Sequence, residues 1–251
     1  MHNLEIFTTP WVLTICAVLF AAFIRGVAGF GFSLILAPIL LLTLNPITVV
    51  VINLFLGLLS NVLVSSYSFK KVNLRKILPM IISSSFGIPI GTWIITLIPP
   101  LSLKILIGGV TVICAIPLAL GFRKTLPREK LFSGISGFFS GVLSSSTSLG
   151  GPPVVLFLHS QNWEKEAIHP TLAVYFSFIC SWSLLTLSFS DLVDIQTIMN
   201  TASLIPALII GTGLGIMVFR KINARYFKWV SMVIVICTGI LGILSGAEIF
   251  P

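Results

Sequence analysis

Residues 143–153 read Leu-Ser-Ser-Ser-Thr-Ser-Leu-Gly-Gly-Pro-Pro, inside an apolar stretch that runs from about 131 to 158. Glycine and proline are both costly in a helix interior, so this stretch is predicted to break instead of forming one helix. A second stretch, about 11–44, carries Arg-Gly-Val-Ala-Gly-Phe-Gly-Phe-Ser at residues 25–33 and is predicted to break there. The fold expected for the chain depends on these two interruptions.

The composition around the two interruptions is that of a membrane protein. Of 251 residues, 56% are hydrophobic and 9% charged, whereas soluble domains carry roughly 25% charged residues. A helix needs about 20 apolar residues to cross a bilayer. The apolar stretches run about 11–44, 46–66, 77–98, 101–121, 131–158, 170–190, 196–219 and 229–249. We therefore expect an all-α integral membrane protein with eight hydrophobic segments in a single domain, 1–251, without a soluble catalytic domain.

Other features of the composition have ordinary explanations. The first apolar stretch has neither a basic start nor a cleavage pattern, so we expect it to be retained. The net charge of +8 comes from Lys and Arg in short loops, which orient membrane proteins and do not indicate nucleic acid. The cysteines lie singly in apolar stretches and are expected to be small buried hydrophobic residues, without metal-site spacing: Cys16, Cys114, Cys180 and Cys237.

The chain shows weak internal similarity. Sliding it by 115 residues lays residues 25–33 over 140–148, and Pro38 over Pro153. Further matches follow in the same order, with small loop insertions: Pro46 with Pro170, Gly91-Thr92 with Gly211-Thr212, and Lys104 with Arg225. The constant order predicts two related halves, about 1–121 and 131–251, as many transporters have.

The basic loops indicate how the halves are oriented. Loops 67–76, 122–130 and 220–228 are rich in Lys and Arg and should be cytoplasmic, whereas the turn at Asp191 and Asp194 should face outward. If all eight stretches crossed once, loops 67–76 and 220–228 would lie on opposite sides. Simple counting therefore conflicts with the charges.

Re-entrant hairpins remove the conflict. If 131–158 enters and leaves on the cytoplasmic side, and 11–44 does the same from outside, each half has one hairpin and three crossings. An odd number of crossings inverts the second half relative to the first, with a site near the midplane. The alternative is eight full spans, two of them bent at glycines, with one basic loop misplaced. Both topologies bring the two breaks close to mid-bilayer.

The breaks are candidate anion sites. Non-helical backbone at membrane depth persists only inside protein or beside a watery cavity, and a helix that starts there presents N–H groups and a positive dipole end. The predicted substrate-binding residues are Gly26, Gly29, Phe30, Gly31 and Ser33 at the first break, and Ser144, Ser145, Ser146, Thr147, Ser148, Gly150 and Gly151 at the second. The alternative for the serine run is that small residues permit close helix packing.

Arg25 lies about 15 residues into an apolar stretch, whereas the other fourteen Lys and Arg residues can be placed in loops or at segment ends. Such a placement costs at least about 2.5–3.5 kcal/mol, so a partner or a wet cavity is expected. All seven Asp and Glu residues are terminal or lie in connections, and the missing counter-ion is therefore predicted to be a substrate whose two oxygens fit the planar guanidinium. The alternative is that Arg25 snorkels to the outer interface.

Other polar residues in the spans have weaker signals. Asn53 is predicted to bind substrate, with Asn61 and Ser177 as secondary contacts, although interhelical hydrogen bonds would explain them equally well. Buried carboxylates for a proton relay are missing, so coupling would use the substrate's own protonation, His159 or His169, or an ion held by carbonyls. No nucleotide-binding loop occurs, and no cofactor or metal is expected.

The two breaks resemble the paired motifs of a known family. Residues 25–33 followed by Ala37-Pro38, together with residues 141–153, are similar to the motifs of the sulfite exporter TauE/SafE family (TSUP) of bacterial and archaeal permeases. The resemblance covers nearly the whole chain. It implies multi-pass transport of sulfite, sulfoacetate or related sulfonates across a prokaryotic plasma membrane, in either direction. Many relatives have more glycine where this chain has its serine and threonine run.

We therefore expect a membrane transporter for small sulfur-containing anions, with the lipid bilayer as its other partner. A channel-like anion conductor is the nearest alternative, and saturable counter-transport would separate the two. An intramembrane enzyme is less favoured, because no histidine cluster, Ser–His–Asp set or carboxylate pair lies in the apolar stretches. A purely structural membrane subunit is the third alternative.

Overall fold

The structure of the chain is a computed structural model that describes residues 9–28, 31–66, 72, 74–120, 128–159, 161, 165–219, 236 and 240. Within these residues the secondary structure is helical and contains no strand. The helices are α1 (Thr9–Ala28), α2 (Phe32–Leu40), α3 (Pro46–Ser66), α4 (Leu74–Leu97), α5 (Pro100–Leu120), α6 (Glu129–Thr147), α7 (Gly151–His159), α8 (Lys165–Phe189), α9 (Ile195–Ala202) and α10 (Ile205–Phe219). The all-α expectation is confirmed.

Several helices have the length and hydropathy of membrane spans. Among the described residues, α3, α4, α5 and α8 each qualify alone, and α9 with α10 qualifies as a pair bent by 44°. Large apolar side chains point outward from these helices, including Trp93 at 63% exposure and Phe189 at 87%, as expected where lipid is the solvent. The predicted stretch 229–249 lies outside the described residues except at 236 and 240.

Both predicted breaks occur. Helix α1 ends at Ala28 and α2 begins at Phe32, after Gly31 with a left-handed φ of 93°. Helix α6 ends at Thr147, where Ser148 also adopts a left-handed conformation with φ 60° and donates its N–H to the Ser144 carbonyl. The following helix begins with Gly-Pro-Pro, and its prolines lie in the first turn, where a missing N–H is tolerated.

The second broken segment folds back on itself. The Ser140 hydroxyl donates to the Gly150 carbonyl at 2.6 Å, and the Ser136 hydroxyl, one turn earlier, donates to the Pro153 carbonyl at 2.8 Å. The earlier residue of α6 thus contacts the later residue of the 150–153 segment, so the two helices run antiparallel. The segment is a hairpin within the fold.

The first broken segment starts and ends in one region of the molecule. Trp11 and Thr14, near the start of α1, line one small cavity together with Leu44, just after α2, and Thr48, in the first turn of α3. Because a straight segment of this length would separate its ends, this shared cavity shows that 11–44 also turns back.

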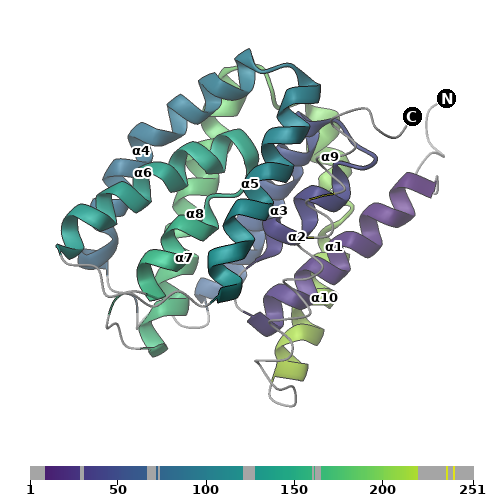
Figure 1. Cartoon of the computed structure of the whole chain (residues 1–251). Helices are drawn as coiled ribbons and strands as arrows, with labels where there is room; N and C mark the ends of the chain where they lie inside the picture. Colours follow the sequence, from purple (N-terminus) through teal and green to yellow (C-terminus); the bar gives the residue numbers. More distant parts are fainter. Residues whose placement is uncertain are drawn as a thin grey trace.

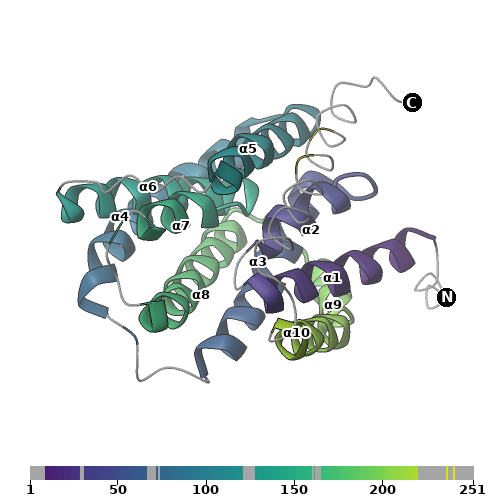
Figure 2. The same cartoon turned by 60° about the horizontal axis from the view of Figure 1, so that its bottom comes forward.

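Among the described helices, two close pairs and one central pair organise the bundle. Helix α4 packs along α6, and α1 packs along α10, in both views of the molecule (Figures 1 and 2), while α3 packs against α8. Glycines permit the close approach: a Cβ at Gly26 would lie 2.6 Å from the Thr212 carbonyl oxygen of α10, and one at Gly141 would lie 2.5 Å from the Ser84 carbonyl oxygen of α4. The packing holds the two breaks in fixed positions.

Candidate functional site

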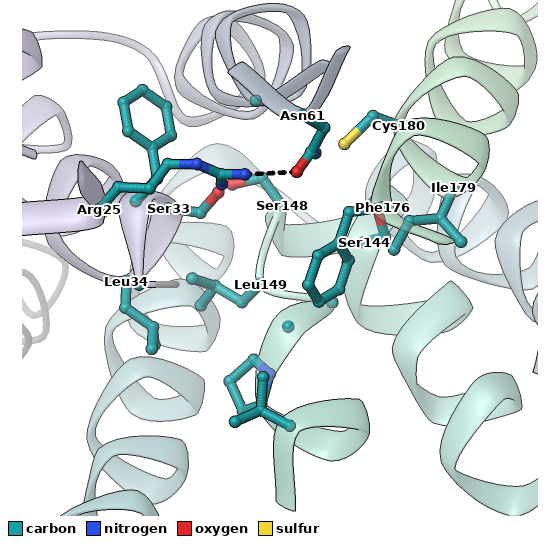
Figure 3. Close-up of a pocket in the computed structure, with 17 residues that line it drawn as sticks. Arg25, Ser33, Leu34, Asn61, Ser144, Ser148, Leu149, Phe176, Ile179 and Cys180 are labelled. Carbon is teal, nitrogen blue, oxygen red and sulfur yellow. Dashed lines mark hydrogen bonds between the residues drawn. The ribbon is translucent and has the colours of Figure 1, made fainter. Parts of the chain in front are cut away.

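A cavity of ≈ 60 Å³ lies between the two breaks (Figure 3). Its walls come from the end of α1, the first turns of α2 and α7, the end of α6, and the middle of α3 and α8. The predicted binding residues that line it are Arg25, Gly31, Ser33, Ser144, Ser148, Gly150 and Gly151, together with Asn61. Tertiary structure thus brings the two motifs, more than a hundred residues apart in sequence, to one space.

Arg25 supplies positive charge to this cavity. It lies in the last turn of α1 and is only 9% exposed. One terminal guanidinium nitrogen donates to the amide oxygen of Asn61 at 2.5 Å, and Figure 3 shows the side chain pointing toward Asn61. Within the described residues, Nε has no hydrogen-bond partner. Since Asn61 is uncharged, the positive charge faces the cavity with donor capacity to spare.

The surroundings of Arg25 show that its side chain does not extend to the lipid surface, which was the alternative prediction. Asn61 is 2% exposed, and Gly57 and Cys180 line the same cavity from α3 and α8. The described acidic side chains lie elsewhere, Glu129 at the first turn of α6 and Asp191 and Asp194 between α8 and α9. Arg25 is therefore a buried cation held inside the protein.

Two helix N-termini meet at the cavity. Gly31, Phe32 and Ser33 line it from the start of α2, and Gly150 and Gly151 line it from the start of α7. The first N–H groups of a helix have no acceptor within the helix, and the positive dipole end adds to their attraction for anions. The predicted convergence of the two interrupted segments is present in the structure.

The serine run divides between the cavity and helix packing. Ser144 and Ser148 line the cavity, where Ser144 accepts a hydrogen bond from the buried Ser183 hydroxyl at 3.2 Å. The Ser148 hydroxyl is buried and has no partner in the described part of the chain. The remaining three hydroxyls donate to backbone carbonyls at 2.7 Å and do not line the cavity: Ser145 to Ile88, Ser146 to Val142, and Thr147 to Leu143.

Other predicted residues lie outside the cavity or outside the described residues. Gly26 packs against α10. The amide nitrogen of Asn53 donates to the Val49 carbonyl at 3.1 Å, and the Ser177 hydroxyl donates to the Ala173 carbonyl at 2.9 Å. Gly29 and Phe30, as well as the side chains of His159 and His169, lie outside the described residues.

The rest of the cavity wall is apolar and was not predicted. It comprises Phe32, Leu34, Gly57, Leu149, Pro152, Val155, Phe176, Ile179 and Cys180. Cys180 was expected to be an ordinary buried hydrophobic residue, and it is buried at 8% exposure, but it also faces the site. Gly57, in the middle of α3, was the one local sequence signal for this wall, because a glycine leaves space where a larger side chain would fill it. The other side chains of the wall resemble those of any membrane helix.

Comparison with known proteins identifies a family for the chain. A family model described as Sulfite exporter TauE/SafE matches residues 14–241. No curated protein and no solved structure matches the chain significantly.

Proposed function

Because the chain belongs to the sulfite exporter TauE/SafE family, we propose that it transports small sulfur-containing anions such as sulfite, binding them in the cavity beside Arg25. Members of the family are permeases, so the chain is a multi-pass membrane transport protein and not an enzyme. The plasma membrane of a prokaryote is the proposed location.

The observation that carries this proposal is the unpaired charge of Arg25. Its guanidinium is buried, donates a hydrogen bond to one neutral amide, and faces a cavity at which two helices, α2 and α7, begin. An anion about 4 Å from such a charge gains roughly 4 kcal/mol at the effective dielectric constant typical of proteins. That attraction offsets the cost of removing a small anion from water, and no described side chain competes for the position.

The size of the cavity favours a small ligand. A volume of ≈ 60 Å³ is about four to six times the ~10–15 Å³ that one water requires in the same measure. A pyramidal oxyanion with a few heavy atoms fits this space, whereas a sulfonate with a longer tail requires the apolar wall to move. The apolar wall would contact the sulfur end of sulfite while the donors hold its oxygens.

The helix contacts support two structurally related halves. Exchanging α1 with α6, α2 with α7, α3 with α8, and α4 with the α9–α10 pair converts the α1–α10 contact into the α6–α4 contact, and the α1–α2 contact into the α6–α7 contact. The central α3–α8 contact is unchanged by the exchange. We propose that the two folded-back segments are re-entrant hairpins that meet near mid-bilayer, and that movement of one half against the other gives alternating access.

The test is transport by the purified protein in liposomes. Sulfite, thiosulfate, sulfate, sulfoacetate, taurine and acetate would be compared as substrates, with oxygen excluded to protect sulfite. We expect saturable sulfite flux that is accelerated by sulfite on the opposite side. Non-saturable flux without counter-transport would indicate a channel, and absence of flux for every anion would refute a transport role for the chain alone.

A further inference from the structure

We propose that Ser140 is a positioning residue that aims the Gly151 N–H into the Arg25 cavity. The inference rests on the proposed function, because it assigns a role to a residue that does not itself line the cavity. Ser140 lies in α6 and is completely buried, and its hydroxyl donates to the Gly150 carbonyl at 2.6 Å.

The geometry of the peptide bond links this hydrogen bond to the cavity. A trans peptide is planar, with its C=O and N–H pointing in opposite directions, and the described residues contain no cis peptide. Because the Gly150 carbonyl points at α6, the N–H of Gly151 in the same peptide points away from α6. Gly150 and Gly151 both line the cavity, so this N–H is directed toward a bound ligand.

The Gly151 N–H matters because α7 has few donors at its start. Most helices offer up to four free N–H groups in the first turn, but Pro152 and Pro153 have none. No acceptor for the Gly151 N–H is present among the described residues. A hydrogen bond to the carbonyl of the same peptide also polarises that peptide and strengthens its N–H as a donor.

Ser140 is needed because the segment it holds is conformationally free. Gly150 must be glycine, since a Cβ there would lie 2.7 Å from the Ser140 carbonyl oxygen and 2.9 Å from the Ser144 Cβ. Two successive glycines allow the peptide between them to rotate. The Ser140 hydroxyl therefore selects the one peptide orientation that serves the cavity.

Ser136 provides a matched control. It lies one turn earlier on α6, is 8% exposed, and donates to the Pro153 carbonyl at 2.8 Å. The peptide after Pro153 carries the N–H of Val154, the fourth residue of α7, which does not line the cavity. Loss of the Ser136 bond therefore weakens the same α6–α7 contact without redirecting a donor of the site.

The experiment compares Ser140→Ala and Ser136→Ala with the native protein, using sulfite and thiosulfate as ligands. The dissociation constants, the thermal unfolding midpoints, and the KM and maximal rate in liposomes are measured for all three. We expect Ser140→Ala to weaken binding about tenfold and raise KM equally with little change in maximal rate, as partial loss of one hydrogen bond to a charged ligand predicts. Ser136→Ala should stay within twofold of native affinity while losing a similar amount of thermal stability.

Two results would overturn the inference: native affinity in folded Ser140→Ala, or an equal loss of affinity in Ser136→Ala. If Ser140→Ala does not fold, Ser140→Cys replaces the hydroxyl with a weaker donor and should give a smaller loss, with unchanged affinity again counting against the role. Failure of the native protein to bind either anion is a separate result, which would overturn the proposed function itself.

Discussion

Replacing Arg25 with methionine should abolish most anion binding without destabilising the protein. Methionine keeps the apolar stem of the side chain but removes the charge and the donors. The Arg25 Nε has no described partner, and one terminal nitrogen bonds only Asn61, so the native guanidinium can make at least one charge-assisted bond to a ligand. Such a bond contributes about 1.5–3 kcal/mol, and the long-range Coulomb attraction adds to it. The dissociation constant for sulfite should therefore rise about 100-fold.

Thermal stability should move in the opposite direction. A buried charge at membrane depth costs at least about 2.5–3.5 kcal/mol, and Arg25 has no described carboxylate to compensate it. Arg25→Met should leave the unfolding midpoint equal to or above that of the ligand-free native protein. Arg25→Lys keeps the charge without the planar fork and should bind about tenfold more weakly than native protein.

The assay is calorimetric titration of purified protein with sulfite, with differential scanning of the same samples. Lys104→Met is the control, because Lys104 lines a shallow pocket formed by the 42–46 and 99–101 turns and not the Arg25 cavity. Equal sulfite affinity in Arg25→Met and native protein would refute the reasoning. A loss of the same size in Lys104→Met would show that overall charge, and not this cavity, controls binding.

Three further substitutions test the packing and the shape of the site. Gly26→Ala, which forces a Cβ to 2.6 Å from a carbonyl oxygen, should lower the unfolding midpoint by roughly 3–10 °C; Gly109→Ala has no neighbour within 4 Å and should not lower it. Ser148→Gly should raise the unfolding midpoint, since a φ of 60° strains a serine but not a glycine. It should also weaken sulfite binding several-fold in titrations, because a hydroxyl that lines the cavity is lost. A lower midpoint with unchanged binding would contradict this. Gly57→Leu should fill the cavity and abolish binding in a folded protein, whereas Gly57→Ala, whose Cβ would lie 3.7 Å from the Cys180 sulfur, should bind normally.

The positions of the two main breaks were predictable because their causes are local. Gly31 needs a left-handed conformation that glycine adopts without strain, and the two prolines after Gly151 cannot continue a preceding helix. The placement of Arg25 beside a polar partner and a cavity was also predictable, since the cost of burying a charge does not depend on which helices surround it. Each of these costs belongs to a single residue or a short segment.

The break between α9 and α10 was not predicted. The stretch 196–219 was interpreted as one crossing, but the chain bends by 44° between Ala202 and Ile205. Pro206, in the first turn of α10, was the local signal. The bend is decided by packing, because α9 contacts α3 while α10 runs along α1.

By itself, the sequence determined that the chain is helical, that it lies in a membrane, where its two broken segments turn, and that Arg25 needs a partner or a cavity inside the protein. Only the tertiary structure decided which hydroxyls line the cavity: Ser144 in the last turn of α6 and Ser148 just after it do so, whereas the hydroxyls of the three residues between them donate to backbone carbonyls. It also decided that Phe176, Ile179 and Cys180 belong to the apolar wall of the cavity. The physical reason is that an apolar side chain is equally stable against lipid, a neighbouring helix or a cavity, so its role depends on helices that pack from distant parts of the chain.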